Sequence, residues 1–208
     1  MITGLRTFIS AISLGLTLIA AGVTAAHADD EAENFMRGIL AEANVVFEAE
    51  TEVERFSEIA RLVDKYVDMR RVSMFVLGQY ARQISDAQRA EYTPLFKEYA
   101  TRVYQDLLSD YSGERLEVVD SVDRSPRDII VNTRVADARP GDRFADTVIH
   151  WRIYKSRDGD MSVFDAGADG IWVAIEQQSQ FKSVIANNGG GPAGIDALIA
   201  DLKTQLGE

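Results

Sequence analysis

The hydrophobic pattern of this chain changes its period near Tyr111. Before that residue, apolar side chains recur every three or four positions, which is the spacing of one face of an α-helix. After it, apolar and polar residues alternate, for example from Ile129 to Val135, as they do in strands with one covered face. No repeat or linker divides the sequence. We therefore predict one α+β domain, in which several helices cover one face of a twisted antiparallel sheet of about four strands.

Four helices are predicted before the change of period, at residues 31–49, 51–67, 69–77 and 85–111. The second and fourth begin with capping-box sequences at Thr51 and Ser85, in which a side chain at each end satisfies a backbone amide of the other. Pro94 interrupts the fourth, because proline lacks the amide hydrogen that an interior helical position donates. The sequence leaves open whether one bent helix or two helices result.

Four strands are predicted after the change of period, at residues 116–122, 129–135, 149–154 and 161–166. Turn sequences at 139–142 and 157–160 separate the later strands, and the Asp-Gly pair in the second turn is a strong hairpin signal. The chain then continues with a helix at 171–186, a glycine-rich loop at 187–194 and a last helix at 195–206.

One side of the predicted helix 85–111 is unusually aromatic. Large apolar side chains follow one another along it at helical spacing: Tyr92, Leu95, Phe96, Tyr99, Val103, Leu107 and Tyr111. Such a stripe is typical of ordinary core, and it also suits the wall of a ligand cavity. Periodicity alone favours the core.

The first 28 residues have the features of a secretory signal peptide. Arg6 precedes an apolar run from Phe8 to Val23, and Ala26-His27-Ala28 has the small-x-small form that a signal peptidase accepts. An uncleaved membrane anchor is the alternative, but the run is shorter than the ~20 residues that a span needs. We expect cleavage after Ala28, export to the periplasm and a single mature domain at 29–208.

The mature chain is distinctly acidic. Removing residues 1–28 takes away one positive charge and no acid, so the net charge changes from −11 to −12. Nucleic acids and anionic membrane surfaces attract basic proteins, so we expect neither as a direct partner. With no cysteine, the exported domain must hold its fold by burial rather than by disulfides.

The residues offer little for catalysis or metal binding. After signal removal His150 is the only histidine and there is no cysteine, so thiolate or histidine metal sites and nucleophile–histidine pairs lack their parts. His150 is expected on the less covered face of the sheet. Asp165 and Asp169 are the nearest to a carboxylate pair, and we expect them to be solvated turn residues. No catalytic residue, metal or cofactor is predicted.

Several motifs, taken in order, resemble a known family. They are Tyr66-Val67-Asp68-Met69, Leu77-Gly78-Gln79-Tyr80-Ala81-Arg82, Val163-Phe164-Asp165, Asp169-Gly170-Ile171-Trp172-Val173, Gln178-Ser179-Gln180-Phe181 and the segment from Gly194 to Leu202. Their order and spacing resemble the periplasmic phospholipid-binding component of the Mla (maintenance of lipid asymmetry) transport system, also called the toluene-tolerance family. The resemblance covers nearly all of the mature chain.

The resemblance implies a lipid carrier rather than an enzyme. It implies an apolar cavity for lipid tails between the sheet and the helices, and two docking partners: an outer-membrane lipoprotein complex and an inner-membrane ABC transporter with a lipid-binding MCE subunit. Membrane association would then be transient and through these partners. Met161, Asp169, Trp172 and Gln178 depart from the family pattern, where tryptophan, glutamate, serine and arginine are usual. These departures put the exact lipid in doubt, and a hopanoid is the alternative ligand.

The predicted cavity wall consists of large apolar residues from the helices and the sheet. They are Leu77, Tyr80, Phe96, Tyr99, Val103, Val131, Ile149, Trp151, Ile153, Phe164, Trp172, Val173 and Phe181. The cavity is expected between the aromatic helix and the face formed by Ile149, Trp151 and Ile153, with its mouth near Trp172. A small α+β enzyme and an adaptor that binds only protein remain as rival functions.

Overall fold

The structure is a computed structural model and describes residues 29–46, 51–109, 114–142 and 144–207. The predicted signal peptide and its cleavage site, as well as Tyr111, lie outside these ranges. The helices are α1 (Asp30–Val46), α2 (Glu52–Tyr66), α3 (Met69–Val76), the 3₁₀ helix η1 (Gly78–Arg82), α4 (Asp86–Ser109), α5 (Val173–Asn187) and α6 (Gly191–Leu206). The strands are β1 (Leu116–Ser125), β2 (Asp128–Val135), β3 (Val148–Lys155), β4 (Met161–Ala168) and β5 (Ile171–Trp172).

The strands form one antiparallel sheet in the order β1-β2-β3-β4-β5. The α+β class and the antiparallel sheet are therefore confirmed, with a fifth short strand added to the four predicted. A register shift after Val118 leaves Val119 outside the regular pairing of β1 with β2. Because of this bulge, Leu116, Val118 and Ser121 all face α1.

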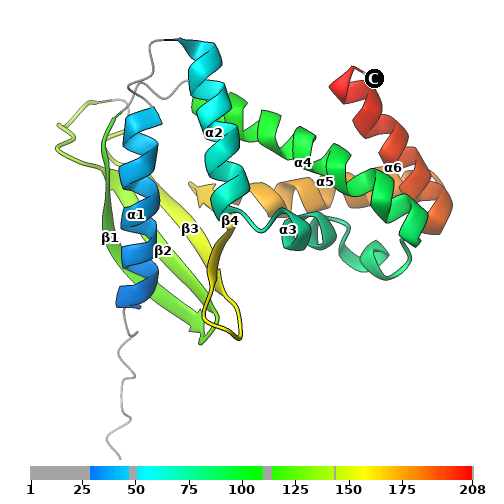
Figure 1. Cartoon of the computed structure of the whole chain (residues 1–208), viewed down its shortest axis with the longest axis horizontal. Helices are drawn as coiled ribbons and strands as arrows, with labels where there is room; N and C mark the ends of the chain where they lie inside the picture. Colours follow the sequence, from blue (N-terminus) through cyan, green and yellow to red (C-terminus); the bar gives the residue numbers. More distant parts are fainter. Residues whose placement is uncertain (1–28, 47–50, 110–113, 143, 208) are drawn as a thin grey trace, which may run out of the picture.

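The described part of the chain divides into two halves, which Figure 1 shows side by side. The sheet half consists of the sheet with α1 lying on one of its faces, and the helical half consists of α3 to α6. α2 lies between them and contacts α1, α4 and β4. Val67, directly after α2, forms a bridge with Val163 of β4 and packs against the apolar clusters of both halves.

The predicted helix starts are confirmed by their capping bonds. The Thr51 hydroxyl accepts a hydrogen bond from the Glu54 amide at 3.2 Å. At α4 the box is reciprocal, because Ser85 Oγ accepts from the Gln88 amide at 3.2 Å and Gln88 Oε1 accepts from the Ser85 amide at 3.1 Å. Pro94 lies inside α4 without dividing it, so one helix is formed.

Three predicted boundaries were wrong. The predicted strand 116–122 continues to Ser125. The predicted helix 171–186 begins only at Val173, because Asp169 and Gly170 adopt left-handed backbone angles and turn Ile171 and Trp172 back to pair with β4. The predicted loop 187–194 is shorter, because α6 already begins at Gly191, with Pro192 in its first turn. Within the described ranges, no helix is both long and apolar enough to cross a bilayer.

Candidate functional site

The helical half gathers six of the predicted wall residues around one core. Leu77, Tyr80, Phe96, Phe164 and Phe181 are buried in it, and Tyr99 packs against it. The Phe181 ring lies edge-on to Phe96, with 6.0 Å between ring centroids, and 5.6 Å from the Tyr99 ring. Pairs of this geometry stabilise beyond the area that they bury. In this structure the aromatic stripe of α4 is therefore a packed core.

The sheet half holds a second group of predicted residues on the face that α1 covers. Val131 and Ile153 are fully buried against α1. Trp151 is half-buried beside them, and its indole Nε1 donates a hydrogen bond to Thr133 Oγ1 at 2.9 Å. Ile149 lies two residues before Trp151 on the same face of β3 and is also half-buried. Apolar surface on this face thus continues beyond the buried cluster.

The predicted meeting of the aromatic helix with the Ile149–Trp151–Ile153 face is not formed. α1 packs on that face, while the aromatic side of α4 packs with α5 and α6. The prediction failed because hydrophobic periodicity shows which face of an element is apolar, but it does not show which two apolar faces meet. Figure 1 shows α1 over the sheet and α4 on the other side of α2.

The opposite face of the sheet carries a polar row. His150 lies there as expected, and its Nδ1 is 2.6 Å from Asn132 Oδ1, while the Asn132 amide donates to Asp120. The Trp172 ring lies across Gly167, with its centroid 6.0 Å from that of His150. Successive strand residues point to opposite faces, so Trp172 and Trp151 are not brought together.

Asp165 is not the solvated turn residue that the sequence suggested. It is 1% exposed, and its Oδ1 accepts hydrogen bonds from the amides of Ala166 at 2.9 Å and Ala174 at 2.8 Å. Ala174 lies in the first turn of α5, whose N-cap residue Trp172 makes no side-chain capping bond. Asp165 therefore caps α5 from β4. Burial raises the pKa of the Asp165 carboxyl, and the two amides and Arg152 partly offset this.

Sequence reasoning also missed Gln177 and Tyr104. Gln177 is 4% exposed and lies one turn beyond Ala174 on the buried face of α5. Tyr104 of α4 lies near enough for the Asp165 charge to act with burial in raising the pKa of its hydroxyl. We call Asp165, Gln177 and Tyr104 the polar seam. The sequence held one signal for the buried Asp165, namely an acidic residue inside a predicted strand with a predicted helix starting soon after it.

Arg152 of β3 acts on the seam through its charge, which lowers the pKa of Asp165. Its guanidinium makes two hydrogen bonds to the Asp128 carboxylate, both at 2.8 Å, and lies 4.8 Å from the centre of the Phe164 ring. The paired guanidinium lowers the pKa of the Asp128 carboxyl. Such bidentate geometry fixes the orientation of both groups.

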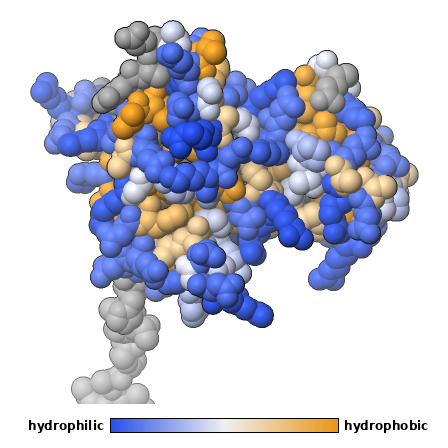
Figure 2. Space-filling view, viewed as in Figure 1, coloured by the Kyte–Doolittle hydropathy of each residue, from blue (hydrophilic) through white to orange (hydrophobic). Residues whose placement is uncertain are grey.

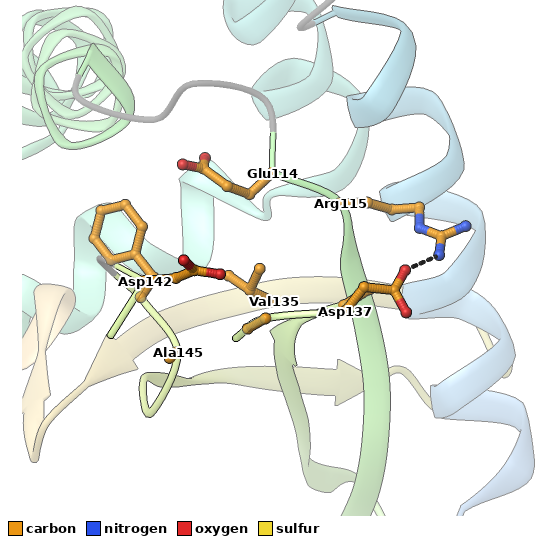
Figure 3. A pocket seen from close by; sticks show the side chains of 9 residues that line it. Glu114, Arg115, Val135, Asp137, Asp142 and Ala145 are labelled. Carbon is orange, nitrogen blue, oxygen red and sulfur yellow. Dashed lines mark hydrogen bonds and ion pairs between the residues drawn. The ribbon is translucent and has the colours of Figure 1, made fainter. Parts of the chain in front are cut away.

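None of the predicted wall residues lines either of two surface hollows in the described part of the chain. The first, of about 380 Å³, lies beside the β2–β3 connection. Figure 3 shows the carboxylates of Glu114 and Asp142 on one side of it and the Arg115–Asp137 ion pair on the other. The second, of about 310 Å³, lies between the end of α1 and α2 and is lined by Val45 and Val46 among charged residues. Whether the predicted wall contacts lipid therefore stays a prediction.

Val103, Trp172 and Val173 complete the predicted set, and all three are half-buried. Among the residues that the structure describes, no group of three or more histidine, cysteine or acidic side chains is placed to hold a metal ion. The arrangement thus offers apolar side chains in quantity and one buried polar seam.

Comparisons with known proteins agree with these observations. The fold is similar to that of the phospholipid-binding protein from Ralstonia solanacearum, solved in complex with a phospholipid, with a TM-score of 0.66 and 20% sequence identity. That similarity covers 85% of this chain and 99% of the other. The sequence pattern of the family described as MlaC protein matches residues 41–204. Since this is most of the chain, the protein belongs to the MlaC family.

Proposed function

We propose that this protein is a periplasmic lipid carrier. It binds the acyl chains of a phospholipid against apolar side chains and moves the lipid between an outer-membrane lipoprotein complex and an inner-membrane ABC transporter with an MCE subunit, which maintains outer-membrane lipid asymmetry. The family membership over residues 41–204 carries this proposal. The similar fold of a protein solved with a phospholipid supports it.

The half-exposed members of the predicted wall are the first contacts that we propose for the lipid. They are Tyr99, Val103, Ile149, Trp151, Trp172 and Val173. A ligand can reach such residues without unpacking a core, whereas Phe96, Val131 and Ile153 are fully buried and would have to separate from their neighbours first. Ile149 and Trp151 are adjacent on one face and form the centre of the proposed surface.

The energetics of lipid transfer support a carrier that docks on partners. An acyl chain of about 15 carbons costs on the order of 12 kcal/mol to expose to water, at roughly 0.8 kcal/mol per methylene. A chain bound to this protein must therefore pass directly into another apolar groove. Figure 2 shows that the visible face is mostly hydrophilic, with hydrophobic residues between the hydrophilic ones. With a net charge of −12 after signal removal, a long stay on an anionic membrane is unfavourable.

No catalytic role is proposed. His150, the one histidine left after signal removal, is paired with Asn132 on the polar face of the sheet. Asp165 is used in capping α5, which places its bonded oxygen beyond the reach of a substrate. An enzyme or a protein-binding adaptor would carry no lipid, which separates both from the carrier.

The decisive experiment is extraction of the mature protein, purified from the periplasm, with organic solvent. Phospholipid recovered in a fixed ratio to protein is the expected result, and the mass of the protein should correspond to cleavage after Ala28. A hopanoid in place of phospholipid would change the ligand within the same function. Extracts with no lipid, from protein that elutes as a folded species, would contradict the carrier function.

A further inference from the structure

The polar seam contains three buried atoms without a hydrogen-bond partner. Asp165 Oδ2, Gln177 Oε1 and Gln177 Nε2 are buried and have no partner among the residues that the structure describes. Native proteins pair the large majority of their buried polar atoms. The two side chains are linked through the first turn of α5, because the Ala174 amide donates to Asp165 Oδ1 and Gln177 lies one turn further along the helix. Their three unpaired atoms therefore indicate a missing partner.

Neighbouring side chains do not supply that partner. The positive charge of Arg152 lowers the pKa of Asp165, but no hydrogen bond joins the two side chains. The Arg152 guanidinium instead makes two hydrogen bonds of 2.8 Å to Asp128. Gln178, next along α5, shows that an unpaired amide is not a general property of this helix, because its Nε2 donates to the Phe75 carbonyl at 2.6 Å. Among the described residues, the only other buried side-chain atom without a partner is Arg55 Nε in α2.

The unpaired atoms specify the chemistry of the missing group. Asp165 Oδ2 and Gln177 Oε1 accept hydrogen bonds, and Gln177 Nε2 donates one. A hydroxyl both donates and accepts, so it can pair with atoms of both kinds. An ammonium has no acceptor for Gln177 Nε2, and a phosphate has no hydrogen for Oδ2 and is repelled by the carboxylate. A neutral hydroxyl group fits both kinds of atom, as a water molecule also does.

The surroundings of the seam are apolar. On α5, Ala174 and Phe181 flank Gln177 on the same buried face. Tyr104 packs against both the core of the helical half and the small cluster of Val46, Ile59 and Val63, as Met69 also does. The seam thus adjoins a continuous apolar interior, which suits a group at the end of a long apolar body better than a free polar solute.

We propose that the polar seam binds the hydroxyl group of a neutral lipid, such as a diacylglycerol, between β4, α5 and α4. This inference rests on the proposed function, because it names a class of lipid that the carrier would accept. The hydroxyl donates to Asp165 Oδ2 and accepts from Gln177 Nε2. Lipids that lack this hydrogen leave the carboxylate oxygen unpaired and bind less well.

A competition between two probes tests the proposal. The delipidated mature protein is mixed with equal amounts of dioleoylglycerol and its O-methyl ether, and the loaded species are counted by native mass spectrometry. We expect the wild type to prefer dioleoylglycerol about tenfold, the discrimination that one buried hydrogen bond of ordinary strength gives. Gln177→Leu removes a donor that the oxygen of either probe can use, so it should weaken the loading of both and keep the preference. The control Gln180→Leu, on the exposed side of α5, should leave both unchanged.

A second variant separates recognition from packing. Asp165→Asn keeps an oxygen for the Ala166 and Ala174 amides and replaces the unpaired oxygen by an NH₂ donor. The ether oxygen can accept from this donor, so the variant should bind the methyl ether nearly as well as dioleoylglycerol. Looser packing alone would not produce this gain. Thermal melting of each variant checks that it is folded.

Equal loading of the two probes by the wild type would overturn the proposal. So would a crystal structure of the loaded protein with only water in the seam. Loading of neither probe by a protein that still binds phospholipid would overturn this inference and leave the proposed function intact. Loading of no lipid of any kind would overturn both.

Discussion

The two halves of the molecule use their apolar residues differently. In the helical half, the large side chains of α4 and α5 pack on one another, and Phe96, Tyr92 and Leu77 are fully buried. In the sheet half, α1 covers Val131 and Ile153 but leaves Ile149 and Trp151 half-buried. Similar hydrophobic patterns therefore have different uses. The buried rings of the helical half stabilise the fold, whereas the sheet half keeps apolar surface that another molecule can cover.

The largest expected effect concerns escape of a bound lipid into water. If tails lie on the sheet half, each chain faces a barrier of about 12 kcal/mol to release, and each 1.4 kcal/mol slows escape about tenfold. We expect labelled lipid loaded on the protein to remain there for hours in the presence of bare anionic vesicles. Addition of the transporter's MCE subunit should speed the loss. Fast loss to bare vesicles, at a rate that the subunit leaves unchanged, would contradict docked transfer.

The next effect tests whether the buried rings of the helical half serve only the core. Phe96→Ala removes a fully buried ring that contacts Phe181 and Tyr92, and it should lower the free energy of unfolding by about 3–5 kcal/mol. The lipid content of the folded fraction should not change. Urea unfolding measures the first quantity and organic extraction the second. A folded variant that has lost its lipid would show that the buried rings of the helical half also contact the ligand.

A smaller effect tests the sheet half directly. Ile149→Trp adds bulk to the half-buried face that we propose for the lipid, and it should reduce lipid content several-fold with a stability change of about 1–3 kcal/mol at most. Ile130→Trp is the matched control, because Ile130 is also half-buried in the sheet but lies on the opposite face. Equal lipid content in both variants would place the ligand elsewhere.

The sequence predicted local structure better than it predicted contacts between distant segments. Thr51 and Ser85 cap their helices as predicted, because a capping box needs only residues three positions apart. The burial of Asp165 could not be foreseen, since it depends on β5 turning back and bringing the first turn of α5 to β4. The face covered by α1 likewise depends on long-range packing. Apolar residues were identified, but their partners were not.

The smallest predicted effect concerns the ion pair that orders the polar face of the sheet. Arg152 lowers the pKa of Asp128 below its ordinary value of 3.8, so the folded state favours the ionised carboxylate. The stabilisation is therefore complete well above pH 3.8 and is lost as the pH falls through the lowered pKa of the folded state. Because both side chains are partly solvated, we expect only about 1 kcal/mol.

The measurement compares the wild type with Asp128→Asn by urea unfolding at pH 7 and near pH 3. The difference in stability should be about 1 kcal/mol at pH 7 and clearly smaller at pH 3, because protonation removes the same charge that the substitution removes. Glu117→Gln is the control, since the Glu117–Arg134 ion pair has the same Nε–oxygen distance of 2.8 Å but is exposed, and it should show almost no difference at either pH. A difference at Asp128 that does not depend on pH would assign its effect to hydrogen bonding alone. A difference as large as that of Phe96→Ala would mean that the sheet half depends on its polar face as much as the helical half depends on its rings.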